Sequence, residues 1–127
     1  MSRHDMAKAK QMADVLLHLQ CESGGWVVRN DYSANGMIPM LAPNDSAYLA
    51  NNGLLSVYRI TQEAQYLEAA EKCAAWIIST ARPDGLVWVG MNAQTGQWIQ
   101  KNNIVDIGFT AGLFAELYTI TSKECYK

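Results

Sequence analysis

Residues 58–66, YRITQEAQY, return sixty positions later as residues 118–126, YTITSKECY. The same offset aligns further pairs without a gap: Ala9 with Ala69, Gly25 with Gly85, Val27 with Val87, and Gly36 with Gly96. One ungapped register over most of the chain predicts a tandem repeat. We therefore expect a single domain, 1–127, built from repeat unit one, 1–61, and repeat unit two, 62–127.

Each unit has the same order of segments: a helix, a glycine-bounded apolar segment, a second helix and a turn that begins with Thr. Hydrophobic periodicity predicts helices near 5–20, 45–60, 63–80 and 105–120. Between the helices, GGWVV with GMIPM, and GLVWV with QWIQ, are typical of short β-hairpin arms, with residues 92–96 as the second turn. The expected fold class is all-α with minor β-hairpin arms, in two tandem helical hairpins.

The helices differ in their polar faces. The first and third carry charge along one side, whereas the stretch SAYLANNGLLSVY of the second has no charge and the stretch IGFTAGLFAELYTI of the fourth has Glu116 as its only charge. Helices that are apolar nearly all round are buried on several sides. We expect two layers, with the second and fourth helices more buried than the first and third.

Composition excludes several functions. Ten Lys and Arg against twelve Asp and Glu give a net charge of −2 in 127 residues, with no basic block for nucleic acid. The apolar run VLLHL is too short for a signal or a membrane span, so we expect a cytoplasmic protein. Cys21, Cys73 and Cys125 fit neither a disulfide framework nor a metal clip, and we expect reduced thiols with Cys73 buried. The sequence contains no phosphate loop or metal-spaced cluster, so neither metal nor cofactor is implied.

This order of helices and arms resembles the α/α-toroid folds. NDSAYLANNGLLSVYRITQEAQYLEAAEKCAAWI looks like the junction between inner helix, turn and outer helix in six-hairpin glycosidases and the related lyases and epimerases. Leu16, Gln20, Gly24 and Trp26 also match L-x3-Q-x3-G-x-W, the QW-type repeat of the terpenoid cyclases. Neither the acid cluster of the protonating cyclases nor prenyltransferase zinc ligands occur, which disfavours isoprenoid chemistry. Four helices do not close a ring, so the resemblance implies a partial toroid.

The resemblance places a ligand funnel at the arms and at the start of the inner helices. There we expect Asp45 and Asp106 as candidate catalytic carboxylates for general acid/base work. The alternative is that each caps its helix, where a carboxylate meets free N–H groups. The sixty-residue register pairs Asp45 with Val105 rather than with Asp106.

Six further residues are candidate substrate-binding groups: Trp26, Tyr48, Asn51, Asn52, Trp88 and Trp98. The tryptophans offer flat faces for stacking on a sugar ring, or else they cover the core or an interface. The sequence therefore indicates either a carbohydrate-binding or carbohydrate-processing domain, or a catalytically silent module that associates with itself.

Self-association is expected because two hairpins supply too few outer helices to cover apolar inner helices. An isologous homodimer is favoured and a ring of three is the alternative, with Phe109, Phe114 and Tyr118 or the arm tryptophans at the interface. A T-x-x-E capping box at residues 121–124 starts a helix with little length left. We expect residues 122–127 to be frayed or docked on a neighbouring chain.

Overall fold

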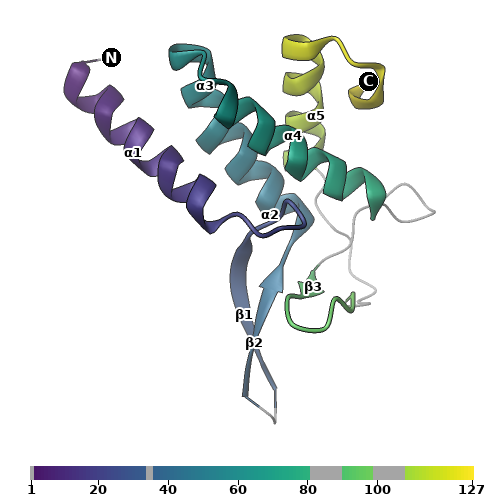
Figure 1. The fold of residues 1–127 in the computed structure, drawn as a ribbon. Helices are drawn as coiled ribbons and strands as arrows, with labels where there is room; N and C mark the ends of the chain where they lie inside the picture. Colours follow the sequence, from purple (N-terminus) through teal and green to yellow (C-terminus); the bar gives the residue numbers. More distant parts are fainter. Residues whose placement is uncertain (1, 34–35, 81–89, 99–107) are drawn as a thin grey trace.

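The computed structural model describes residues 2–33, 36–80, 90–98 and 108–127 (Figure 1). In this part of the chain a row of helices stands on one side and a small sheet extends from one end of it. The elements follow in the order α1 (Arg3–Leu19), β1 (Val27–Ser33), β2 (Gly36–Leu41), α2 (Pro43–Tyr48), η1 (Leu49–Leu55), α3 (Ser56–Thr61), α4 (Ala64–Ser79), β3 (Met91–Asn92), α5 (Gly108–Thr121) and η2 (Glu124–Tyr126). A mostly helical fold with minor β arms is confirmed.

The second predicted helix is one continuous run made of α2, η1 and α3. Its middle, η1, is a π-helix, and the backbone N–H of Ser56 donates to the carbonyl of Asn51, five residues back. Gly53 lies within this segment, and a Cβ there would meet Leu16 Cδ1 at 2.4 Å. The absence of a side chain at Gly53 therefore lets α1 approach the inner helix closely.

The predicted burial order is wrong for the third and fourth helices. The third, α4, has seven buried residues, among them Tyr66, Cys73 and Trp76, whereas α5 has three. The reason is position: α4 contacts α2, η1 and α3 and also α1 and α5, while α5 packs mainly on α2 and stands at the edge of the row (Figure 1). The apolar composition of α5 predicted more burial than its place in the chain provides.

The first arm is a hairpin, as predicted. Strands β1 and β2 pair antiparallel, with an irregularity between Val27 and Arg29. Strand β3 adds to β2, so the sheet has the order β1-β2-β3. The turn at 92–96 is confirmed, because Asn92 Oδ1 accepts from the backbone N–H groups of Gln94 and Thr95 and Gly96 has a φ of +74°. The predicted GLVWV strand lies outside the described residues.

The turn that follows each inner helix is built twice in the same way. Gln62 and Ser122 take the left-handed conformation, with φ of 57° and 58°. In each case the preceding threonine hydroxyl accepts from the next backbone N–H: Glu63 N reaches Thr61 Oγ1, and Lys123 N reaches Thr121 Oγ1, both at 3.3 Å. The sequence echo thus corresponds to a repeated backbone turn.

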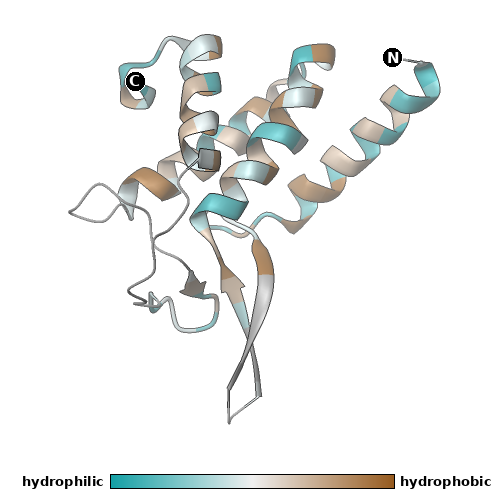
Figure 2. Cartoon of the chain, turned by 180° about the vertical axis from the view of Figure 1, so that it is seen from behind, coloured by the Kyte–Doolittle hydropathy of each residue, from teal (hydrophilic) through white to brown (hydrophobic). Residues whose placement is uncertain are grey.

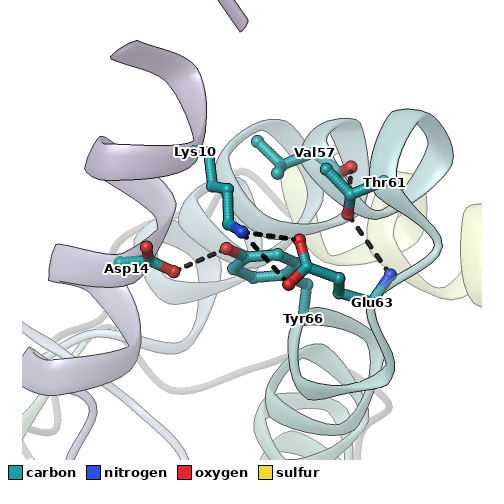
Figure 3. A network of polar contacts seen from close by, with 6 residues as sticks. All are labelled: Lys10, Asp14, Val57, Thr61, Glu63 and Tyr66. Atoms are coloured by element: carbon teal, nitrogen blue, oxygen red, sulfur yellow. Dashed lines mark hydrogen bonds and ion pairs between the residues drawn. The ribbon is translucent and has the colours of Figure 1, made fainter. Parts of the chain in front are cut away.

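The first of these turns joins unit one to α4 (Figure 3). Tyr66 donates its hydroxyl to Asp14 on α1 at 2.5 Å, and Lys10 pairs with Glu63 at 3.0 Å. Burial and this hydrogen bond raise the pKa of the Tyr66 hydroxyl, and Glu63 raises that of Lys10. The first helix of unit two, α4, therefore begins by binding α1, the first helix of unit one.

The second turn makes the equivalent joint with the charges exchanged. Lys123, which aligns with Glu63, pairs with Glu71 of α4 at 2.7 Å, and Tyr126, which aligns with Tyr66, donates to the same carboxylate at 3.2 Å. Tyr126 is buried, and its ring stacks on Phe114 of α5. The prediction of a frayed or partner-docked end at 122–127 is wrong, because η2 docks on its own chain.

Candidate functional site

The QW-like residues form a structural lock at the end of α1. Gln20 Nε2 donates to the carbonyls of Gly24 and of Ala69 on α4, both at 2.9 Å. Trp26 Nε1 donates to the carbonyl of Leu16 at 2.9 Å, and the ring is 2% exposed. Trp26 is therefore part of the core, and its prediction as a stacking surface for sugar is corrected. The alternative expectation, that this tryptophan covers the core, is the one that the structure supports.

A pocket opens beside this lock, between the first arm and the starts of the inner helices. Its volume is about 450 Å³. Three elements line it: the arm through Val27 and Val28, the first inner helix through Asp45, Tyr48 and Leu49, and α5 through Phe109. The lining combines aliphatic and aromatic faces with one carboxylate, a composition typical of small-molecule sites.

Asp45 lies in the first turn of α2 but does not cap it. The N-cap position is Ala42, and Asp45 is exposed, with neither a hydrogen bond nor an ion pair from its side chain to any part of the chain that the structure describes. The adjacent Asn44 makes the polar contact instead, and its Oδ1 accepts from the backbone N–H of Thr110 at 3.1 Å and from its hydroxyl at 3.3 Å. The Asp45 carboxylate thus lines the pocket without a described partner and can accept a hydrogen bond from a ligand.

Tyr48 and Phe109 form the aromatic wall. Their ring centroids are 4.7 Å apart with planes inclined by 59°, and the side chains are 44% and 42% exposed. Such tilted pairs are a favourable arrangement of aromatic rings. Because both rings remain partly open, an apolar face of a ligand has a surface to rest on.

The π segment explains an offset that the sequence alone left unresolved. A π-turn closes over five residues where an α-turn closes over four, so η1 contains one residue more than the matching α-helical stretch of α5. In α2, immediately ahead of η1, the units align at sixty-one positions, whereas the first helix and the arm of each unit keep the offset of sixty. This register pairs Tyr48 with Phe109 and, in sequence, Asp45 with Asp106, which lies outside the described residues.

The remaining predicted ligand residues are dispersed. Asn51 and Asn52 lie in η1 and are not among the described residues that line the pocket. Trp98 is half-buried, and its ring stacks on Trp76 with centroids 6.1 Å apart. Trp88 lies outside the described residues. Among the tryptophans described, Trp26 and Trp98 therefore pack against protein.

Four residues of the pocket were not predicted from the sequence as ligand-binding groups: Val27, Val28, Leu49 and Phe109. The sequence predicts Phe109 at a subunit interface instead. An offset of sixty-one rather than sixty aligns Phe109 with Tyr48 and would have indicated it as a pocket residue. Val27 and Val28 follow a buried tryptophan in an alternating strand, where period two turns one neighbour outward. Val27 and Val28 line the same pocket as Phe109 only because unit two packs against unit one, and this packing is not visible in a local sequence pattern.

One thiol with a strongly shifted pKa lies in the core. Burial raises the pKa of the Cys73 thiol to about 12, and the residue is fully buried as predicted. Such a thiol is unreactive at neutral pH. In the described ranges, no three His, Cys, Asp or Glu side chains come together as a metal site. Nor is any helix in those ranges long and apolar enough to cross a membrane.

Comparison with known proteins finds a partial relative. A Caenorhabditis elegans protein, Uncharacterized protein B0495.5, is 33% identical to this chain over 84 residues. The match covers 61% of the chain and 12% of that protein, so the chain spans a small part of the relative's length. No family model matches the chain. No solved structure matches it either.

Proposed function

We propose that the pocket between β1, α2 and α5 binds a saccharide. One observation carries this proposal: an exposed carboxylate without a described partner, Asp45, stands beside two partly open aromatic rings in a concave site. A sugar ring presents C–H groups on its faces and hydroxyls around its edge. Tyr48 and Phe109 supply surfaces for the faces, and Asp45 supplies an acceptor for the hydroxyls.

Geometry assigns separate roles to these groups. Val27, Val28 and Leu49 exclude water from one side of the pocket, which strengthens a hydrogen bond made inside it. Tyr48 carries both a ring and a hydroxyl, so it contributes a donor as well as a stacking face. The proposal is one of binding, because acid/base chemistry on a glycosidic bond uses two carboxylates. Among the described residues that line the pocket, Asp45 is the one carboxylate.

Processing of the saccharide is the extension of the proposal that involves Asp106. In sequence this residue holds the position in unit two that Asp45 holds in unit one once the π segment is counted. The twice-built turn supports the proposed kinship with α/α-toroid proteins, whose ligands meet the starts of inner helices. Under that proposal, both carboxylates belong to one function.

Binding is tested by titrating the ¹⁵N-labelled chain with a panel of neutral mono- and disaccharides and following amide chemical shifts. The expected result is a saturable shift at Asp45, Tyr48 and Phe109 with at least one sugar. Asp45→Asn and Tyr48→Ala should each weaken that binding by about tenfold to a hundredfold, as expected for the loss of a hydrogen bond to a charged group or of a stacking face.

Glu22→Gln is the matched control, because Glu22 is an exposed carboxylate outside the described lining of the pocket. It should bind as the wild type does. Asp106→Asn in the same titration shows whether a second carboxylate takes part. Shifts confined to other surfaces, or equal affinity in the Asp45→Asn variant, would remove the basis of the proposal.

A further inference from the structure

A second hollow lies on α5, away from the Asp45 pocket. It has a volume of about 450 Å³ and is lined by Ala111, Phe114, Ala115, Tyr118, Tyr126 and Lys127. We call these six residues the α5 groove. Its lining combines two small alanines with three aromatic rings, a composition that accepts the side chains of another helix.

Repeat symmetry indicates what kind of element covers such a surface. The counterparts of Ala115, Tyr118 and Tyr126 in unit one are Leu55, Tyr58 and Tyr66. That surface is closed: α4 lies against η1 and α3, and Leu55 and Tyr66 are both 0% exposed. In unit two the equivalent alanine is exposed. The α5 groove therefore corresponds to a surface that binds a helix in unit one, and no described helix covers it.

The other edge of the molecule carries an apolar stripe that the repeat does not require. Met12, Val15 and Leu19 lie on one face of α1 and are 70%, 52% and 59% exposed. The equivalent positions of α4 are also exposed, but they hold Lys72, Ala75 and Ser79. We call Met12, Val15 and Leu19 the α1 stripe. Large apolar side chains at these positions are particular to the first helix.

The groove and the stripe stand at opposite ends of the row of helices. Figures 1 and 2 show α1 at one edge and α5 at the other from both sides, and hydrophobic residues recur along α1 in Figure 2. One surface is a convex helix face and the other is a concave groove. Contiguous exposed apolar surface of this kind marks an association site.

We propose that the α1 stripe of a second copy of this chain occupies the α5 groove. The contact joins two different surfaces, so it is heterologous, and a pair of copies keeps one free groove on one copy and one free stripe on the other. Such contacts close into a ring when the rotation allows and otherwise continue as a chain of copies. This arrangement differs from the isologous dimer expected from sequence and does not depend on saccharide binding.

Sedimentation velocity of the full chain at tens of micromolar tests the proposal, together with one charged variant on each surface. Val15→Asp places a carboxylate in the stripe, and Ala115→Arg fills the groove with a charged side chain. Both positions are exposed, so circular dichroism should show an unchanged helical fold. Each variant alone should be monomeric, with the dissociation constant raised at least about tenfold.

Mixing the two variants distinguishes this interface from a symmetric one. Val15→Asp retains an intact groove and Ala115→Arg an intact stripe, so the mixture should form a one-to-one dimer that goes no further. Ala75→Asp, the equivalent of Val15→Asp on α4, is the matched control and should associate as the wild type does. A monomeric wild type, a Val15→Asp variant that still associates, or a mixture that stays monomeric would each overturn the proposal.

Discussion

Replacing Gln20 by Ala tests whether the QW-like residues are a lock rather than part of a ligand site. The Gln20 amide joins three segments, because it leaves the end of α1 and donates to the Gly24 carbonyl before β1 and to the Ala69 carbonyl in α4. Gly24 is buried, and its Cα lies close to the α4 backbone. A Cβ at this position would meet the Lys72 carbonyl oxygen at 2.4 Å. The lock thus holds the first arm against α4.

The expected loss follows from the two hydrogen bonds. Each is worth about 1 kcal/mol, and burial of an acceptor left without its donor adds to the loss. Gln20→Ala should therefore lower the free energy of unfolding by about 2 kcal/mol. For a chain of this length, that corresponds to a fall in Tm of about 6 to 10 °C.

Urea unfolding followed by tryptophan fluorescence and by circular dichroism measures the change. Gln11→Ala is the matched control, since Gln11 is exposed on the same helix, and its variant should unfold within about 0.5 kcal/mol of the wild type. Gln20→Glu should be less stable than Gln20→Ala at neutral pH, because a carboxylate would face two carbonyl oxygens.

Lowering the pH should reduce the difference in stability between Gln20→Glu and Gln20→Ala. Crowding by carbonyl oxygens raises the pKa of the introduced carboxyl in the folded state, so the penalty is present above that pKa and is relieved as the pH falls through it. A Gln20→Ala variant as stable as the Gln11→Ala control would refute the lock.

Three further outcomes are expected. A thiol reagent should label exposed Cys125 in the native protein, whereas Cys73, whose pKa burial raises to about 12, should react only on unfolding; fast labelling of both would show that the core opens. Stability should fall as the pH rises above about 10, because the raised pKa of Tyr66 keeps its hydroxyl protonated in the folded state while the unfolded chain ionises, and Tyr66→Phe should flatten this dependence in urea midpoints. Asn44→Ala removes the acceptor for the Thr110 N–H and hydroxyl and should reduce stability by about 1 kcal/mol in thermal unfolding; an unchanged Tm would mean that this contact is dispensable.

Local signals were sufficient to predict the elements. Helix periodicity, the Thr-started turns and the glycine-bounded arms predicted the helices to within a few residues and placed the first hairpin. These features depend on near neighbours in the chain, and a left-handed residue at Gln62 or Ser122 is set by the turn it closes. The burial of Cys73 also followed from its alignment with Ala13.

Position within the whole molecule could not be read in the same way. The apolar composition of α5 is a property of the chain, but its exposure at the edge is a property of how many helices stand beside it. The docking of Tyr126 on Glu71 likewise joins residues fifty-five positions apart. Neither is encoded in a local pattern.

The candidate site divides along the same line. The sequence by itself determined that Asp45 and Tyr48 lie near the start of an inner helix, since local periodicity fixes where that helix begins. Only the tertiary structure decided that Trp26 is enclosed, that Phe109 faces Tyr48, and that one extra residue in η1 sets their register. The physical reason is that the phase of a helix and the packing of one unit on another depend on contacts between distant segments, which outweigh the preferences of any single stretch.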